Sequence, residues 1–362
     1  QANRDNVLAA TAALTTVIAS LNNKTEEKRH RVKVPGFVVN TVPLFTIDEF
    51  RSRYRLTRSA FEFVLGELMK YELLNQHEEP TSSKGIPGDK QLLIFLDYIG
   101  HQCNQSELEV LYDVSAGKVN EIVHSLPRKI VPTLSSQFIK WPTELEAHTN
   151  AEGTLYHSGF PNVLGAIDGS HIEISTASSD FTTRKYRQAI TLQAVASRNL
   201  LFYDVFVGCS GRMHDARVFQ YSPLAAKVQT GENMYGLHLL GDGAYPLLNG
   251  LLTPFVDNGN LSNVQKQYNK HLSVARQVVE RAFGQLKARF RRLRYIYQRD
   301  VPSICYTIVA ACTLHNICIL KNEASFEEDL DDLIDDYQDD QLAPQNNNQT
   351  TQQKRWAIAE SL

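Results

Sequence analysis

Three β-rich segments in the second half of the chain constrain its fold more than any other feature. Residues 163–174, 189–197 and 200–209 are rich in β-branched and aromatic residues and follow one another closely, which is typical of antiparallel strands. A helix is predicted to begin near Asp215, and a fourth apolar segment follows at residues 237–246. This order, with further helices after it, predicts an α/β fold with a ribonuclease-H-like core, in which a mixed sheet is flanked by helices.

The sequence before these strands predicts helices. Residues 57–75 place apolar side chains at helical spacing after a threonine cap, residues 77–89 have loop composition, and another helix follows from Lys90. At 362 residues the chain is long enough for about two domains. We therefore divide it into an N-terminal helical or flexible extension, an all-α domain, the ribonuclease-H-like domain and a C-terminal tail, at residues 1–44, 45–150, 151–320 and 321–362.

Residues 106–130 predict a helix-turn-helix within the all-α domain. The turn is expected at Asp113–Val114, and Ser115 is expected to cap the second helix. The core face of that helix would hold Val119, Ile122 and Val123. If the helix docks on DNA, the residues that face the groove are Lys118, Asn120, Glu121 and His124. The alternative is an ordinary helical packing unit, because the candidate recognition helix has a single lysine there and Gly117 is costly in a helix.

Charge is divided unevenly along the chain. The net charge is −3, yet residues 321–362 hold three basic and eleven acidic residues, which leaves residues 1–320 with a net charge of +5. A mildly basic body suits a protein that binds a polyanion. The acidic tail has too little apolar surface to offset its ordering entropy, so we expect it to be disordered or only transiently helical. A DNA-mimicking or partner-binding tail is the alternative.

Two other classes of protein fit the composition poorly. No uninterrupted run of about 18 apolar residues occurs, so no membrane association is expected. The Ala-rich segment at residues 7–21 is expected to form an amphipathic helix rather than a signal sequence. The five cysteines form no CxxC pair, which indicates reduced thiols of an intracellular protein rather than a zinc site.

Two Asp-Gly pairs follow apolar segments. Asp168-Gly169 interrupts the first strand segment and Asp242-Gly243 follows the fourth. One such pair is also a common hairpin turn, so Asp168-Gly169 alone leaves a turn and a functional site equally open. If the two segments are adjacent central strands, their carboxylates lie close together and must share a proton or a cation. A hard divalent metal ion satisfies that requirement, and glycine after each acid lets a ligand approach the backbone.

A third acid lies in the segment at 273–295, which predicts a long helix capped by Ser273. Its apolar stripe comprises Val279, Ala282, Phe283, Leu286, Phe290 and Leu293. A second stripe beside it comprises Arg276, Glu280, Gly284, Lys287, Arg291 and Arg294. Glu280 could simply pair with Arg276, which contributes ~0.3–0.5 kcal/mol. However, residues 281–299 hold seven basic residues and no acid, which suits a metal ligand beside a phosphate backbone.

Five blocks of the sequence resemble, in the same order, those of the PIF/Harbinger transposases and the nucleases derived from them. The blocks are FPNVLGAIDGSHIEI, GRMHDARVF, LLGDGAYP, VVERAFGQLKARFRRL and ACTLHNIC, and the resemblance extends over roughly residues 45–320. It implies a ribonuclease-H-like core with an Asp-Asp-Glu triad, which by position is Asp168, Asp242 and Glu280. The spacings of 74 and 38 residues leave no room for a large domain inserted before Glu280. Gly243 stands where many relatives have serine.

The resemblance implies a DNA endonuclease or transposase that cleaves and joins phosphodiesters at transposon ends by two-metal phosphoryl transfer, with two Mg²⁺ or Mn²⁺ ions. Asp168 would bridge the ions, with Asp242 and Glu280 each holding one. The alternative is a domesticated protein that binds DNA or chromatin and no longer cleaves. Relatives commonly act with a Myb/SANT-like DNA-binding protein that aids nuclear entry. We therefore expect a nuclear protein, cytoplasmic without that partner, that binds double-stranded DNA at terminal inverted repeats and target sites and can form homo-oligomers.

Further residues have expected roles around this site. Phosphate contacts are assigned to Arg184, Lys185, Lys287, Arg291 and Arg294, with Lys118 in the helix-turn-helix. His171, His214 and Asp215 are candidates for supporting the metal site or contacting DNA. The sequence favours Asp215 as a helix N-cap over either of these roles. His315 is expected to be a packed, hydrogen-bonded histidine rather than a ligand.

Overall fold

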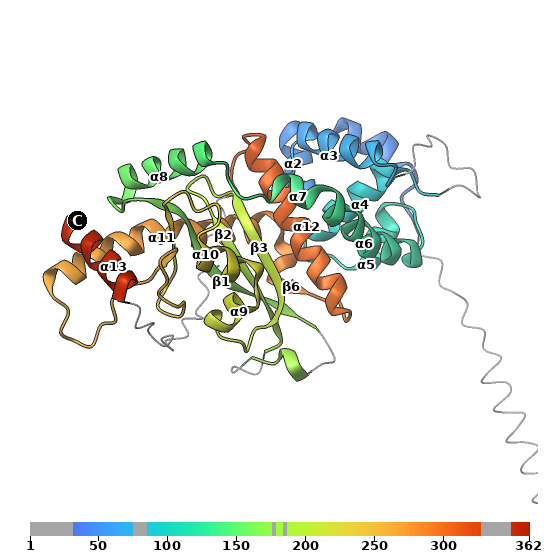
Figure 1. Cartoon of the computed structure of the whole chain (residues 1–362). Coiled ribbons are helices and arrows are strands. Elements are labelled where there is room, and N and C mark those ends of the chain that lie inside the picture. Colours follow the sequence, from blue (N-terminus) through green and yellow to red (C-terminus); the bar gives the residue numbers. More distant parts are fainter. Residues whose placement is uncertain (1–31, 75–84, 176–178, 184–186, 327–348) are drawn as a thin grey trace, which may run out of the picture.

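A computed structural model describes residues 32–74, 85–175, 179–183, 187–326 and 349–362 (Figure 1). Its centre is one six-stranded sheet, with the strand order β3-β2-β1-β4-β5 and β6 paired to β1. The strands are β1 (Val163–Ile174), β2 (Ala189–Ala196), β3 (Phe202–Ser210), β4 (His238–Leu240), β5 (Leu251–Leu252) and β6 (Tyr295–Ile296). Strands β1 to β3 are antiparallel, whereas β4 and β6 run parallel to β1 and β5 runs parallel to β4. The sheet is therefore mixed, as predicted.

Strand β1 has an incomplete partner on one side. β4 pairs with β1 only as far as Ala166, and β6 pairs with it from Glu173. Among the described residues, no strand pairs with this side of residues 167–172. On its other side β1 continues without interruption along β2, where Gly169 lies opposite Gln193. Asp168-Gly169 is thus in the middle of a strand, and the hairpin-turn interpretation is wrong.

Helices cover both faces of the sheet. α11 (Asn263–Arg289) and α12 (Val301–Leu320) contribute to one hydrophobic cluster with side chains of all three antiparallel strands. On the other face, α8 (Glu144–Ser158), α9 (Asp215–Tyr221) and α10 (Pro223–Thr230) pack with Leu164, Ile167 and Val195. This arrangement of a mixed sheet between helices confirms the predicted α/β class.

Helix α11 is longer than predicted at its start and shorter at its end. Ser262, rather than Ser273, is its N-cap, because Ser262 and Gln265 form a reciprocal capping box. The helix ends at Arg289, and residues Arg291–Arg294 form a separate 3-10 turn, η5. The predicted stripe of Arg276, Glu280 and Lys287 therefore lies on the helix, but Arg291 and Arg294 do not.

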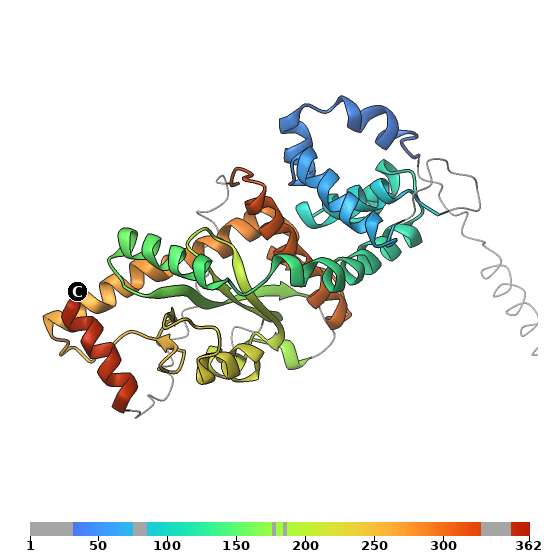
Figure 2. The same cartoon turned by 45° about the horizontal axis from the view of Figure 1, so that its top comes forward.

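The residues before α8 form a helical region at one end of the molecule (Figure 2). Its elements are η1 (Phe37–Thr41), η2 (Val42–Leu44), α2 (Ile47–Tyr54), α3 (Arg58–Lys70), α4 (Gly88–Gly100), α5 (Gln105–Leu111), α6 (Ala116–Ile130), η3 (Val131–Ser135) and α7 (Ser136–Phe138). The same hydrophobic cluster runs from Phe50 in this region to Ala166 in the sheet. Helix α8, which begins at Glu144, packs on β1. The predicted boundary at residue 150 thus falls inside a helix that belongs to the sheet.

The α5–α6 pair has the expected local geometry. Asp113 takes a left-handed conformation with φ 46°, and Ser115 accepts a hydrogen bond from the amide of Lys118 at 3.3 Å. The side chains expected on the core face of α6 are buried, namely Val119, Ile122 and Val123. The exposed Lys118 pairs with Glu121 at 2.7 Å, which leaves this face with little net positive charge. DNA docking by α6 stays a prediction.

Helix α12 is long and apolar enough to cross a membrane by composition, but 72% of its most apolar window is buried inside the fold. It packs against β3 and α6. His315 and Asn316 on this helix bond to β3 and the turn before it: His315 Nε2 lies 3.0 Å from the Leu200 carbonyl, and Asn316 Oδ1 accepts from the Phe202 amide at 2.9 Å. α12 is therefore the central helix of the core, and His315 is packed and hydrogen-bonded as predicted.

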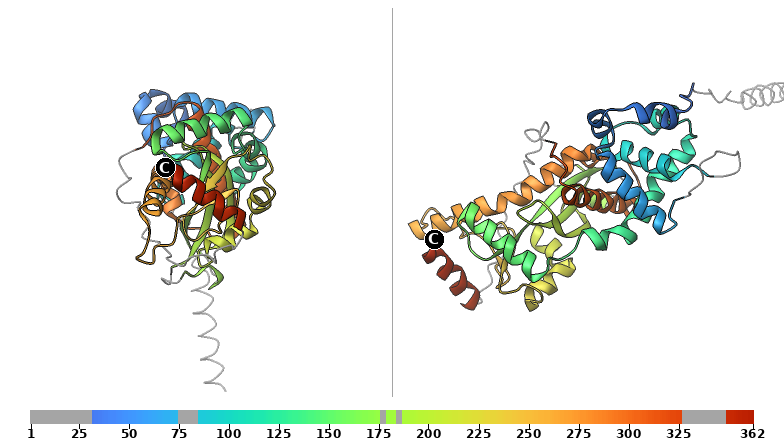
Figure 3. Two further views of the ribbon diagram at one scale, coloured as in Figure 1. Left: turned by 60° about the vertical axis from the view of Figure 1, so that its left-hand side comes forward. Right: turned by 90° about the horizontal axis from the view of Figure 1, so that it is seen from above.

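The prediction of a disordered tail differs from the structure at the described parts of that tail, whereas its acidic stretch at 327–348 lies outside the described residues. The structure describes 321–326 and 349–362 of that tail, and α13 (Gln349–Ser361) is a helix beside the first turns of α11 (Figure 3). The Arg355 guanidinium lies 4.1 Å from the centroid of the Phe255 ring, and Trp356 packs against the same ring. Contacts with the Phe255 ring thus stabilise α13, which the number of acidic residues in the tail does not predict.

The start of the same tail is held by a buried ion pair. Arg289 at the end of α11 donates to Glu323 at 2.7 Å, and the two side chains are 4% and 1% exposed. Glu323 also accepts from the amide and the hydroxyl of Thr57, both at 2.8 Å, and so caps the N-terminus of α3. One carboxylate thereby joins the tail, the sheet's long helix and the helical region.

We predict that Glu323→Ala destabilises the protein by about 3 to 5 kcal/mol, because it leaves the Arg289 guanidinium buried without a counter-ion. The matched control is Lys118→Ala, which breaks an exposed pair and should cost less than about 1 kcal/mol. Urea unfolding followed by circular dichroism measures both. Equal, small losses in the two variants would contradict the proposed role of Glu323.

Candidate active site

Three aspartates from separate elements converge beside the incompletely paired edge of β1. Asp168 lies two residues beyond Ala166, and Asp242 lies two residues beyond Leu240, which is paired to Ala166 in the parallel β1–β4 ladder. Asp215 reaches them from the start of α9. One carboxylate oxygen from each of the three lies within 4.8 Å of the others. The predicted proximity of Asp168 and Asp242 is therefore observed, and it follows from strand register.

Asp215 occupies space that only a glycine leaves open. A Cβ on Gly169 would lie 2.5 Å from Oδ1 of Asp215, which is closer than van der Waals contact allows. His214, rather than Asp215, is the N-cap residue of α9, and Asp215 is the first residue of the helix. The N-cap prediction for Asp215 is therefore wrong, and its carboxylate belongs to the acidic cluster. The position of Asp215 within GRMHDARVF, one of the blocks that carry the resemblance, was the available signal.

Arg276 links Glu280 to the aspartates. Its guanidinium donates to Asp168 Oδ2 at 2.8 Å and to Glu280 Oε1 at 2.6 Å. The side chain of Arg276 is 18% exposed, whereas that of Glu280 is 50% exposed. Glu280 thus makes the i−4 pair considered above and also lies at the open margin of the site. Glu280 can therefore pair with Arg276 and also belong to the acidic site, because Arg276 bonds to Asp168 as well.

Burial makes negative charge costly at this site. Loss of hydration raises the pKa of Asp168 to about 7; Arg276 opposes this shift, while Asp242 adds to it. Burial also raises the pKa of Asp242, against the effect of Arg276 and of backbone amides such as that of Ala244, which donates to it at 3.0 Å. A cation beyond Arg276 would therefore be bound favourably here.

The donor set fits hard divalent cations. Carboxylate oxygens are the ligands that Mg²⁺ and Mn²⁺ prefer. Two buried polar groups near the cluster lack hydrogen-bond partners among the described residues, the hydroxyl of Tyr245 and the carboxamide of Gln193. Gln193 faces Gly169 across the β1–β2 ladder, and all three aspartates raise the pKa of Tyr245, although burial is the larger cause. Unsatisfied donors and acceptors beside an acidic cluster suit a hydrated metal ion.

Comparison with known proteins identifies the domain that carries this cluster. Residues 167–316 match the family described as DDE superfamily endonuclease. This segment of the chain is therefore similar to DDE superfamily endonucleases. The matched segment includes all four acids of the site, and it extends to α12.

Relatives of the whole chain agree with the Harbinger-type resemblance. An ALP1-like protein of Arabidopsis thaliana is 25% identical over 335 residues, which cover 86% of this chain and 77% of that protein. The candidate nuclease HARBI1 of Rattus norvegicus is 25% identical over 291 residues, 77% of this chain and 81% of its own length. The Arabidopsis thaliana protein named antagonist of like heterochromatin protein 1 is 24% identical, with coverages of 77% and 76%. No solved structure matches the chain.

The basic residues around the acidic cluster serve more than one purpose. Lys287 is 5% exposed and donates to the backbone carbonyl of His171 at 3.0 Å. Its assignment as a phosphate contact is therefore wrong, because its ammonium instead satisfies the unpaired edge of β1. Arg289 and Arg292 are buried as well, and Arg292 donates to the carbonyls of Tyr98 and Cys103 in the helical region.

The other assigned phosphate contacts keep their status as predictions. Arg291 and Arg294 are half-buried in η5. Lys118 is exposed but paired with Glu121. Arg184 and Lys185 lie outside the described residues.

We predict that metal-free protein loses stability as pH rises from about 4 to 7. The folded-state pKa of Asp168 is about 7, whereas an unfolded aspartate titrates near 3.9, so in this window the folded state binds more protons and its stability falls. Asp168→Asn should remove that dependence, and the variant's stability relative to wild type should rise by a few kcal/mol over the window. Urea unfolding of both proteins in EDTA, at a series of pH values, measures the free energy of unfolding. Parallel profiles of that free energy against pH would contradict the prediction.

Proposed function

We propose that the protein is a divalent-metal-dependent DNA endonuclease and transposase with a ribonuclease-H-like core. It would cleave and join phosphodiesters at transposon ends. The observation that carries this proposal is the convergence of Asp168, Asp242 and Asp215, with Glu280 tied to them by Arg276. A strand register and a helix start place these acids, so they form a preorganised set of oxygen donors rather than scattered surface charge.

Each residue of the site has a role in this proposal. Asp168 would contact two cations, with Asp242 and Glu280 each holding one, and Asp215 would be an additional ligand on the α9 side. Bound Mg²⁺ or Mn²⁺ supplies an activated water or sugar hydroxyl and stabilises charge on the leaving oxygen. Arg276 holds Asp168 and Glu280 in place before a cation enters. No side chain is needed as a nucleophile.

The exposed face of α6 supports a division of labour in DNA recognition. Lys118 is neutralised there by Glu121, so the N-terminal part of this helix has little charge with which to hold a phosphate backbone. We propose that double-stranded DNA is recognised with the help of a Myb/SANT-like partner protein and that the complex acts in the nucleus.

A second function is favoured by one relative. The similarity to a protein named antagonist of like heterochromatin protein 1 suggests a domesticated protein that acts on chromatin without cleaving DNA. The complete set of acids favours cleavage over this alternative, because a protein that only binds DNA needs no buried, mutually repelling carboxylates.

We predict that wild-type protein cleaves terminal-repeat DNA with Mg²⁺ or Mn²⁺ and the partner supplied, and that Asp168→Ala lowers cleavage by at least about a thousandfold, as expected when a group that positions the reacting phosphate is lost. The matched control is Asp257→Asn, at an exposed loop residue, which should cleave normally. Gel analysis of end-labelled DNA measures the products. The same absence of product from wild type and Asp168→Ala would favour the chromatin alternative.

We predict that Asp215→Asn weakens Mn²⁺ binding about 10- to 100-fold, a loss typical when a metal site's supporting groups are removed. Glu280→Gln should have a smaller effect on affinity, because the Glu280 side chain is half exposed. Titration calorimetry with Mn²⁺ measures both without any DNA. Unchanged affinity in Asp215→Asn would remove Asp215 from the ligand set.

A further inference from the structure

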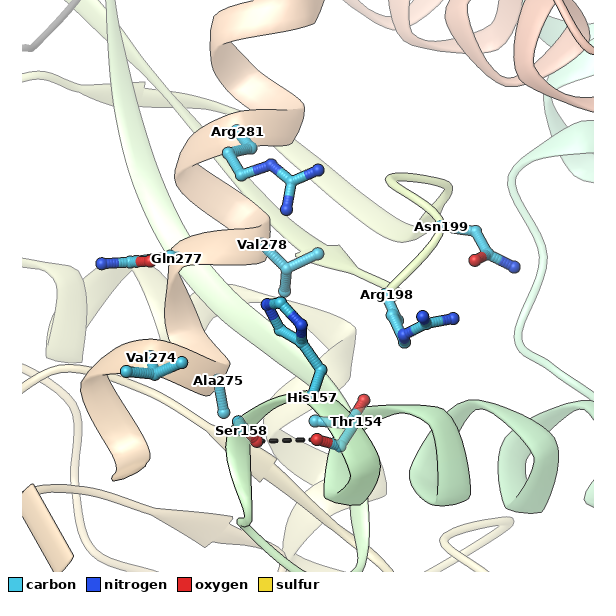
Figure 4. A pocket seen from close by; sticks show the side chains of 10 residues that line it. All are labelled: Thr154, His157, Ser158, Arg198, Asn199, Val274, Ala275, Gln277, Val278 and Arg281. Carbon is cyan, nitrogen blue, oxygen red and sulfur yellow. Dashed lines mark hydrogen bonds between the residues drawn. The ribbon is translucent and has the colours of Figure 1, made fainter. Parts of the chain in front are cut away.

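A cavity of about 290 Å³ lies on the other flank of α11, between α8, α11 and the turn that joins β2 to β3 (Figure 4). Three basic side chains line it, His157 from α8, Arg198 from the turn and Arg281 from α11. Gln277 and Asn199 add amide groups, and none of the described residues that line the cavity is acidic. Figure 4 shows these three side chains coming from three different elements. The cavity therefore concentrates positive charge and hydrogen-bond donors.

The backbone of Arg198 is held at the cavity wall. Its backbone amide donates to Asn150 Oδ1 at 2.8 Å, and the Asn150 amide group donates in turn to the carbonyl of Leu164 at 2.9 Å. The turn is closed by a hydrogen bond from the Leu200 amide to the Ser197 carbonyl at 2.9 Å. The position of Arg198 is thus fixed by α8 and by β1.

A glycine in α8 makes room for Arg198. A Cβ on Gly153 would lie 3.0 Å from Cδ of Arg198 and 3.2 Å from Nε and Nη1. Glycine inside a helix costs about 0.5 to 1 kcal/mol relative to alanine. Here it allows the arginine side chain to lie flat against the helix, with its guanidinium at the cavity.

The basic side chains of this cavity make no structural bonds within the described part of the chain. The side chains of Arg198, Arg281 and His157 make no hydrogen bond or ion pair with any described residue. Arg289 and Arg292, by contrast, are buried and bonded to protein groups. Charge that holds no structural partner and gathers around a cavity without an acid suits an anionic ligand.

We propose that this cavity binds a backbone phosphate of the DNA strand on which the site acts, an inference that rests on the proposed function. Arg281 follows Glu280 directly, and successive residues of a helix point about 100° apart. The cavity and the acidic cluster therefore lie on two flanks of the same turn of α11. A strand whose reacting phosphate reaches Glu280 passes Arg281 with one of its neighbouring phosphates.

The chemistry of the cavity favours a phosphodiester over other anions. Guanidinium groups bind phosphate oxygens with paired hydrogen bonds, and two of them are present. The volume is at the lower end of the range for small-molecule sites, so it accommodates a phosphate with part of its sugar rather than a large cofactor.

The test is the salt dependence of DNA binding by the full chain, measured by fluorescence anisotropy with a labelled duplex and no metal ion. The double variant Arg198→Gln/Arg281→Gln should lower the slope of log K against log salt by about 0.9, the value for one lost phosphate contact. Arg198→Lys/Arg281→Lys keeps the charge and should restore the slope. The control Lys266→Gln/Lys270→Gln removes two exposed charges from α11 outside the cavity and should leave the slope nearer that of wild type.

Three results would overturn the proposal. The first is an unchanged slope in the glutamine double variant while circular dichroism shows that it is folded. The second is an equal loss in the control, which would indicate an effect of net charge alone. The third is stabilisation of wild type, but not of the double variant, by inorganic phosphate at constant ionic strength without a change in slope, which would indicate a free-anion site. Failure of the proposed function would instead appear as absent metal-dependent cleavage, which this binding assay does not read.

Discussion

The arrangement of the site depends on one guanidinium placed among buried carboxylates. Arg276 bonds to Asp168 and Glu280 and opposes the rise in pKa that burial causes in Asp168 and Asp242. Without such a cation, four acids brought together by α9, α11 and the sheet would repel one another strongly in a region of low dielectric constant. The arginine therefore allows the fold to keep these acids together. Because burial still raises the pKa of Asp168, further cations would bind favourably at this site.

The incomplete edge of β1 explains why the site lies where it does. A strand paired along both sides would leave no room for ligands beside residues 167–172. Here β4 ends after Leu240, so Asp242 can turn back toward Asp168, and Lys287 from α11 bonds to the carbonyl of His171 at the same edge. In the gap between β4 and β6, the Lys287 side chain, rather than another strand, therefore donates to the backbone of β1.

The sequence was sufficient for the parts of the site that follow from strand patterns. Asp168 and Asp242 were predicted because each acid interrupts an apolar run and the runs were expected to be neighbours. Asp215 was a candidate for supporting the metal site, but the N-cap role was favoured because an aspartate at a helix start has an adequate local explanation; only the close approach to Gly169 shows its direction. Lys287 was misassigned for a related reason, because a count of basic residues does not distinguish a buried ammonium bonded to a carbonyl from one that faces DNA.

Helix α11, which is 27 residues long, contributes to the core, to the acidic cluster and to the basic cavity with different faces. One face supplies apolar side chains to the core, the adjacent stripe supplies Arg276 and Glu280 to the acidic cluster, and the opposite flank supplies Arg281 to the basic cavity. Its end is fixed to the helical region through Arg289 and Glu323. Because one helix carries both Glu280 and the cavity arginine, a DNA strand held at one flank, as we propose, would be positioned at the other without any loop having to move.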